Sequence, residues 1–172
     1  LYNKMDDRLN SYFIFNESLI LADTETSFSR TDLFLEPICI ENQVGKTVDN
    51  KQIYKIENMD EGEWVCLRNL GREYVYKNDE IDSVNDIESF SPTKIKVFDD
   101  EFLEEIKEFN QKDVINKAIK VMADENIAEG DIRVSRSYQL VFYSDKYKGL
   151  CYNCQYFIDE NDIVYLYDGK LD

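Results

Sequence analysis

Alternating apolar and polar positions predict strands from the first third of the chain onward. Residues 34–41, with the sequence FLEPICIE, place four side chains on one face: Phe34, Glu36, Ile38 and Ile40. Pro37 has no N–H to donate to a neighbouring strand, so we expect this segment at the edge of a sheet.

Further short runs rich in β-branched and aromatic residues also predict strands. They cover residues 53–57, 63–68, 73–77 and 94–98. The second and third runs flank residues 69–72, in which Gly71 can adopt a positive φ, so a hairpin is expected there.

Apolar residues at helical spacing predict a pair of helices in the middle of the chain. Asp99 is suited to cap the first helix, whose apolar face would hold Phe102, Ile106 and Phe109. The apolar stripe then changes phase and resumes as Ile115, Ala118, Ile119 and Met122. We therefore expect two helices, at 99–110 and 113–125, with Asp113 capping the second.

The last third of the chain has the pattern of a three-strand meander. Residues 138–144, 150–158 and 163–167 are rich in Tyr, Phe, Val and Ile, and short polar connections separate them. The fold class predicted from these patterns is α+β, with two antiparallel sheet regions packed around the central pair of helices. A chain of 172 residues is long enough to bury an ordinary core. We expect a single domain over residues 1–172, or two lobes that meet near the acidic, polar segment 78–93.

The charge balance limits the classes of partner. The chain has 36 acidic and 20 basic residues, for a net charge of −16. Such a charge repels phosphate backbones and anionic membrane surfaces, which disfavours nucleic-acid binding. An acidic surface that only keeps the protein soluble is one interpretation. An acidic protein that blocks a basic partner is the other.

The spacing Cys151-x-x-Cys154 raises the question of a metal or redox site. In a strand, residues three apart point to opposite faces, so these two thiols could not hold one ion together. We therefore expect the cysteines to pack as small apolar side chains and predict no metal site. A disulfide, for which Cys39 and Cys66 are the best candidates, is the main alternative.

The sequence contains no histidine, which removes most activated nucleophiles and the HExxH zinc proteases. We predict no catalytic residue and no cofactor. A carboxylate-dependent hydrolase stays open because acidic pairs are abundant, and it would require one carboxyl with a raised pKa. The acidic segment DENDI, residues 159–163, is either a calcium site or a solvated turn, and Asp and Asn favour the turn.

Aromatic residues are the main candidates for binding. Seven of the twelve tyrosines lie in the predicted meander, and the single tryptophan lies in the first sheet region. Tyr combines an apolar ring with a polar tip, which suits a protein, peptide or glycan partner. The candidate binding residues are Trp64, Tyr143, Tyr152 and Tyr156. The alternative is that these rings pack the helices against the sheets.

Two segments resemble known bacterial sequences. Residues 53–81, which begin IYKIENMDEGEWVCLRN, and residues 140–168, which begin LVFYSDKYKGLCYNCQYF, are similar to segments of uncharacterised lipoproteins of Gram-positive bacteria. They also resemble outer-face domains of membrane metallopeptidases related to β-lactam sensor-transducers. The resemblance covers about half of the chain and transfers no functional residue. It implies an extracytoplasmic module, anchored in the cell envelope, that senses or binds a ligand.

These observations together predict a non-enzymatic extracytoplasmic binding or sensing domain. An acidic inhibitor or immunity-type protein of the cytosol is the alternative. No apolar run is long enough to span a bilayer, so we expect no direct membrane insertion. The sequence begins at Leu1 without an initiator Met, so we expect any anchor to precede it.

Overall fold

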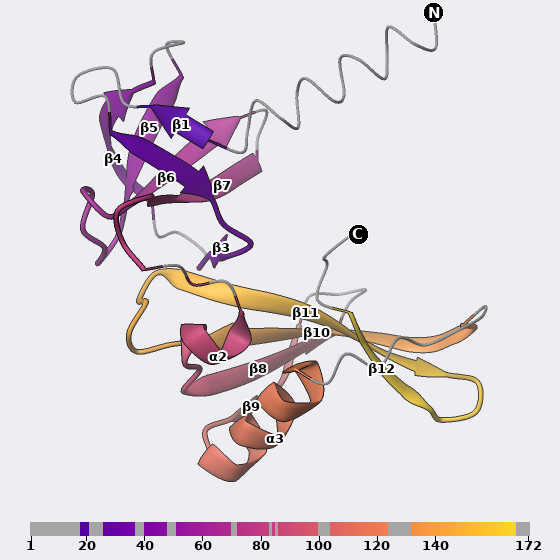
Figure 1. Cartoon of the computed structure of the whole chain (residues 1–172). Coiled ribbons are helices and arrows are strands. Elements are labelled where there is room, and N and C mark those ends of the chain that lie inside the picture. Colours follow the sequence, from indigo (N-terminus) through magenta and orange to yellow (C-terminus); the bar gives the residue numbers. More distant parts are fainter. Residues whose placement is uncertain are drawn as a thin grey trace, which may run out of the picture. The chain divides into compact units, whose positions relative to one another are not determined.

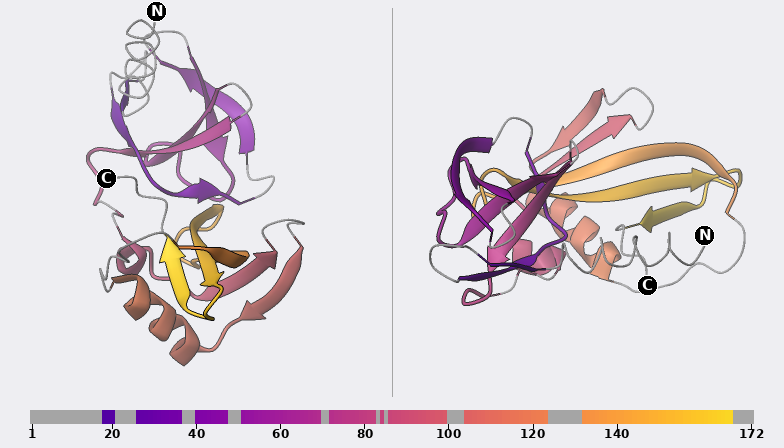
Figure 2. Two further views of the ribbon diagram at one scale, coloured as in Figure 1. Left: turned by 90° about the vertical axis from the view of Figure 1, so that its right-hand side faces the viewer. Right: turned by 90° about the horizontal axis from the view of Figure 1, so that it is seen from above.

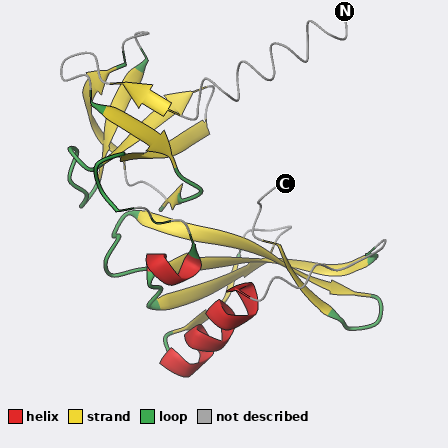
Figure 3. Ribbon diagram, viewed as in Figure 1, coloured by secondary structure: helices red, strands yellow, loops and turns green. Residues whose placement is uncertain are grey.

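The chain divides into two compact units, Leu1–Ser83 and Val84–Asp172, and strands dominate both (Figures 1 and 3). The computed structural model describes residues 18–20, 26–36, 40–47, 51–69, 72–82, 84, 86–99, 104–123 and 132–167. The division between Ser83 and Val84 falls inside the polar segment 78–93. Each unit has its own antiparallel sheet.

The first unit is a six-stranded antiparallel sheet with the strand order β1-β2-β7-β6-β5-β4. Its strands, with the short β3 that follows β2, are β1 (Ser18–Ile20), β2 (Ser27–Arg30), β3 (Phe34–Leu35), β4 (Ile40–Lys46), β5 (Gln52–Ile56), β6 (Trp64–Asn69) and β7 (Arg72–Asn78). The strands predicted at 53–57, 63–68 and 73–77 are therefore confirmed. Pro37 and Gly71 lie outside the described residues.

Both faces of the central strands of this sheet are buried. One face forms the core cluster of Phe28, Ile53, Val65, Leu67 and Tyr76. The opposite face contains Ile56, Trp64, Cys66 and Val75, which are also buried. Burial on both faces explains why the segment WVCL is a continuous apolar run rather than an alternating one.

The second unit is built on a sheet with the strand order β12-β11-β10-β8-β9, in which every pair of neighbours is antiparallel. Its elements are α2 (Ile87–Phe90), β8 (Lys94–Asp99), β9 (Glu105–Phe109), α3 (Lys112–Ala123), β10 (Val134–Tyr143), β11 (Leu150–Asp159) and β12 (Val164–Tyr167). The strands β10, β11 and β12 are neighbours in chain order, so the predicted C-terminal meander is confirmed.

Aromatic contacts pack the helical side of this unit. The ring of Phe90 in α2 stacks on Tyr147 with a centroid distance of 5.6 Å, and it lies 6.4 Å from Tyr152. Phe142 meets Tyr152 edge to face at 6.4 Å. Asp86 caps α2 by accepting the Ser89 N–H at 2.7 Å. The helices α2 and α3 are neighbours beside the sheet (Figure 2).

The predicted central pair of helices is wrong, and the fold is mostly β rather than α+β. Residues 105–109 of the expected first helix form β9, which pairs with β8. The N–H of Asp99, the expected helix cap, donates to the Glu104 carbonyl at 2.9 Å within this hairpin. The second predicted helix, 113–125, corresponds to α3.

Cross-strand charge favours a strand in this segment. The Lys96 ammonium lies 2.7 Å from a Glu105 oxygen and 3.6 Å from a Glu108 oxygen. Opposite charges facing each other across an antiparallel pair favour the ladder. The helical spacing of the apolar residues therefore did not determine the secondary structure of residues 105–109.

Candidate functional site

The structure does not bring the four candidate aromatic residues together. Trp64 belongs to the sheet of the first unit, and Tyr143, Tyr152 and Tyr156 belong to the second unit. Trp64 is 2% exposed and Tyr152 is 5% exposed, so both rings lie in cores. Tyr143 and Tyr156 are half-buried on opposite faces of the β10–β11 pair, as the register of these strands requires.

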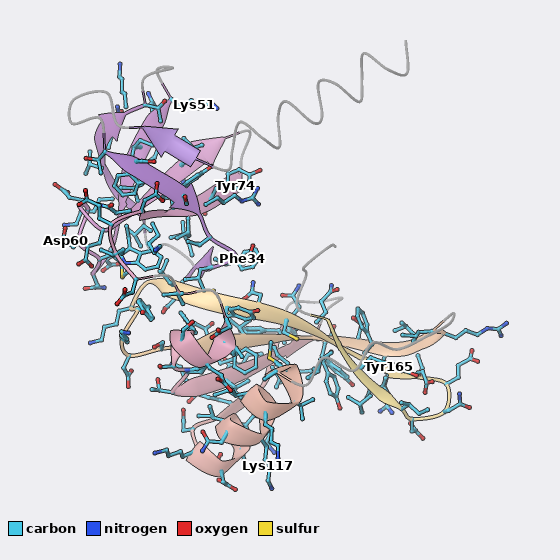
Figure 4. All side chains as sticks on the ribbon, in the orientation of Figure 1. Phe34, Lys51, Asp60, Tyr74, Lys117 and Tyr165 are labelled. Carbon is cyan, nitrogen blue, oxygen red and sulfur yellow. The ribbon has the colours of Figure 1, made fainter. Side chains whose placement is uncertain are left out.

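A different surface gathers exposed apolar side chains at the far end of the meander. Ile132, Val134, Ile163 and Val164 are each between 39% and 51% exposed. We call these four residues, together with Tyr165, the meander tip. Figure 4 shows Tyr165 in this end of the sheet, well away from Lys117 of α3.

Strand pairing brings the two segments of the meander tip to the same end of the sheet. Val134 of β10 lies opposite Asp159 of β11, and the Asp159 N–H donates to the Ile163 carbonyl at 3.0 Å. Val134, Asp159 and Ile163 therefore form one row across three strands. Phe157 and Tyr165, which lie opposite each other, continue the same face inward.

Asp159 fixes the turn that carries this surface. One carboxylate oxygen accepts the N–H groups of Asn161 and Ile163, each at 2.8 Å. The other oxygen accepts the Asn161 amide and the Tyr165 hydroxyl, each at 3.4 Å. Asp162 adopts a positive φ of 60°, which closes the turn.

These hydrogen bonds have electrostatic consequences. The pKa of the Asp159 carboxyl is below its ordinary value, mainly because the carboxylate accepts the backbone N–H of Ile163. The backbone and side-chain N–H groups of Asn161 lower this pKa further. Loss of solvent and the nearby Asp159 charge raise the pKa of Tyr165. Both Asp159 oxygens face donors of their own turn, so the structure favours the solvated turn over the calcium site. No cluster of three potential ligands occurs in the part of the chain that the structure describes.

The cysteines occupy cores. Cys151 and Cys154 are buried in β11 and point to opposite faces, with Cys151 Sγ 3.6 Å from Asn153 Oδ1 and Cys154 Sγ 3.3 Å from the Gln155 carbonyl oxygen. Burial raises the pKa of the Cys66 thiol to about 12. Cys66 is a free thiol, so the alternative of a disulfide between it and Cys39 is not supported, and Cys39 lies outside the described residues.

Acidic side chains gather at one end of the first unit. The turns after β5 and after β7 contain seven exposed carboxylates: Glu57, Asp60, Glu61, Glu63, Asp79, Glu80 and Asp82. We call these seven residues the acidic end. In Figure 4, Asp60 lies at the opposite end of this unit from Lys51.

Hydrogen bonds join the two turns of the acidic end. The Asn78 side-chain amide donates to the Gly62 carbonyl at 2.8 Å, and its oxygen accepts the Glu80 N–H at 2.9 Å. Lys77 is buried, and its ammonium donates to the Ile81 carbonyl at 2.6 Å. Hydrogen bonds from Ser27 and Ser29 lower the pKa of Asp79.

The described carboxyls with shifted pKa values are not suited to acid catalysis. Among the described carboxyls, Asp79, Glu108 and Asp159 have shifted pKa values, and all three are lowered. A general acid at neutral pH needs a raised pKa instead. These three carboxyls therefore give no support to the hydrolase alternative.

No family model, curated protein or solved structure is significantly similar to this chain. Neither described helix is long and apolar enough to cross a bilayer. Sequence reasoning missed the meander tip because its two segments are about 30 residues apart and meet only through strand register. The sequence did offer one signal for this surface, namely apolar residues near the ends of segments predicted to be strands of one meander.

Proposed function

We propose that this protein is a non-enzymatic binding protein that recognises another protein through the meander tip. The observation that carries the proposal is the gathering of four large, exposed apolar side chains at one end of the second sheet. Exposed apolar side chains that gather at one place on a protein are typical of interaction sites. Tyr165 adds an amphipathic ring of the type enriched at interfaces.

The setting we propose is extracytoplasmic, in the cell envelope of a Gram-positive bacterium. Its support is the resemblance of residues 53–81 and 140–168 to envelope lipoproteins and to outer-face domains of membrane metallopeptidases. Protease treatment of intact cells tests it directly, because an extracytoplasmic chain is digested and a cytosolic chain is protected.

Site-specific crosslinking in living cells tests the binding role. A photoreactive amino acid replaces Ile163 in one strain and Ile106 in another. Ile106 is a matched control because it is an equally exposed isoleucine of the same sheet, at the opposite edge in β9. We expect a discrete adduct with one protein from position 163 only. Adducts that are the same from both positions, or no adduct from position 163, would refute the role.

The acidic end favours a second candidate function, the blocking of a basic partner. Seven exposed carboxylates are held close together, and none of them pairs with a cation among the described residues. Such a field would speed the association of a basic protein and make it salt-dependent. The triple variant Glu61→Gln, Glu63→Gln, Glu80→Gln would then slow association with a partner identified by crosslinking, whereas a matched Glu88→Gln variant would not.

A further inference from the structure

The two edges of the second sheet differ in a way that indicates a use for one of them. An exposed strand edge presents unpaired N–H and C=O groups, and proteins usually protect such edges with charges, bulges or Pro. The edge strand β9, EIKEF, contains Lys107 and two glutamates, and its pairing with β8 has a register shift. This edge is protected.

The opposite edge strand, β12, has none of these devices. Its sequence is VYLY, preceded by Ile163, and its pairing with β11 has no register shift. No strand in the described part of the chain pairs with its outer side. An uncharged, regular strand edge is suited to accept another strand.

The direction of the backbone groups follows from the register. The N–H of Asp159 donates to the Ile163 carbonyl, which marks this pair as hydrogen-bonded. Hydrogen-bonded and non-hydrogen-bonded pairs alternate along an antiparallel ladder. The next pair, Ile158 with Val164, is therefore non-hydrogen-bonded, and the pair Tyr156 with Leu166 is non-hydrogen-bonded too. The N–H and C=O groups of Val164 and Leu166 consequently point to the outer edge.

We infer that an extended segment of a basic partner protein adds to β12 as a further antiparallel or parallel strand. The inference rests on the proposed function, because this edge belongs to the meander tip. Side chains flank the edge on both faces, Val164 and Leu166 on one and Ile163 and Tyr165 on the other, so apolar side chains of the added strand find contacts on either face.

Charge decides between a partner protein and a second copy of this chain. The second unit has 19 acidic and 11 basic residues, a net charge of −8, within a chain of −16. Two copies would repel each other at an edge of only four residues. Glu160 and Asp162 are exposed in the turn that leads into β12. A partner segment with Lys or Arg beside its apolar residues is therefore favoured.

Selection from a phage-displayed library of random peptides tests the inference, with the full chain as bait. We expect the selected peptides to combine alternating apolar residues with flanking Lys or Arg. N-methylation of every second residue of a synthetic binder should abolish binding, because those N–H groups face β12, whereas methylation of the intervening residues should be tolerated.

Val164→Pro is the decisive variant of the protein. Proline removes an outward N–H, which an edge strand tolerates, and leaves the bonds to β11 intact. It should weaken peptide binding at least tenfold, whereas Val164→Thr, which keeps the N–H, should weaken it less than threefold. Unchanged melting temperatures of both variants would show that the fold is retained.

The outcomes separate this inference from the proposed function. If Ile163→Ser abolishes binding but Val164→Pro does not, the meander tip binds without strand addition, and only the inference fails. If neither variant changes peptide binding, both fail. If the library gives no binder, only the inference fails, and crosslinking from position 163 decides the proposed function separately. A wild-type dimer that Val164→Pro dissociates would assign the edge to a second copy and overturn the partner proposed here.

Discussion

The Asp159 carboxylate accepts the N–H of Ile163 at 2.8 Å and so holds the turn between β11 and β12. The same oxygen accepts the Asn161 N–H at the same distance. Ile163 is exposed directly beside this buried anchor. The shape of the meander tip therefore depends on one carboxylate.

The first prediction concerns Asp159→Ala. Removal of the carboxylate leaves the Asn161 and Ile163 N–H groups without their acceptor, so this turn should open more often. We expect the hydrogen-exchange protection of both amides to fall roughly tenfold, by the loss of about one net hydrogen bond each. Glu160→Ala is the control, because the Glu160 side chain is exposed in the same turn and the substitution keeps its backbone N–H, which donates to the Arg133 carbonyl. Equal effects of the two substitutions would contradict this role of Asp159.

The second prediction concerns pH. The pKa of Asp159 is lower in the folded chain than its ordinary value of 3.8, so the folded state favours the charged form. The stabilisation is therefore complete above that ordinary value, and it is lost as the pH falls through the lower, folded pKa.

Comparison with Asp159→Asn isolates this effect from other titrating groups. The protection of the Ile163 amide in the wild type should exceed that in the variant at neutral pH, and the difference should shrink as the pH falls below about 4. A difference that is constant across this range would show that the charge of Asp159 does not matter to the turn.

The third prediction concerns Asn78, which joins the two turns of the acidic end. Asn78→Ala removes the donor to the Gly62 carbonyl and the acceptor for the Glu80 N–H, and the site is buried. We expect the free energy of unfolding to fall by about 1–3 kcal/mol in urea denaturation. Asn110→Ala is the control, because Asn110 is exposed and bonds only to Glu108. Its effect should stay within about 0.5 kcal/mol.

The fourth prediction concerns thiol chemistry. Cys66 is fully buried, and its pKa of about 12 keeps the thiol protonated at pH 8. Only the thiolate is a nucleophile, so Cys66 should resist alkylation in the folded chain. It should react within minutes in urea. Peptide mapping by mass spectrometry after a brief iodoacetamide pulse measures both states, and rapid modification of the folded chain would be inconsistent with this core.

The strands β5 to β8 and β10 to β12 could be predicted from the sequence because their apolar residues either alternate or form short uninterrupted runs. The strands β1 and β2 were not predicted, and the single strand predicted at 34–41 is divided into β3, Phe34–Leu35, and β4, which begins at Ile40. The meander β10–β12 follows directly from three Tyr-, Phe- and Val-rich segments with short connections. The segment 105–109 could not be assigned in this way, because Ile106 and Phe109 fit a helical spacing as well as a strand. Its pairing with β8 is supported by Lys96, which lies opposite Glu108 in the ladder and hydrogen-bonds to Glu105, nine residues further along the chain.

The candidate site was less predictable than the fold. Tyr and Trp were expected at a binding surface, but Trp64 and Tyr152 are large enough to dominate the cores that they fill. The exposed residues Ile132 and Val134 lie far in sequence from Ile163 and Val164. Only the register between β10, β11 and β12 places these residues at one end of the sheet. Register depends on long-range pairing, which local patterns do not specify.

The central claim is that this protein binds another protein through the meander tip. The most direct test is the affinity of the crosslinked partner, measured by titration calorimetry with the wild type, Ile163→Ser and Ile106→Ser. The two isoleucines are similarly exposed at opposite edges of one sheet, so both variants should fold. We predict that Ile163→Ser weakens binding at least tenfold and that Ile106→Ser leaves it within twofold, the loss of one buried isoleucine side chain being of that order. Equal affinities of the two variants would contradict the claim.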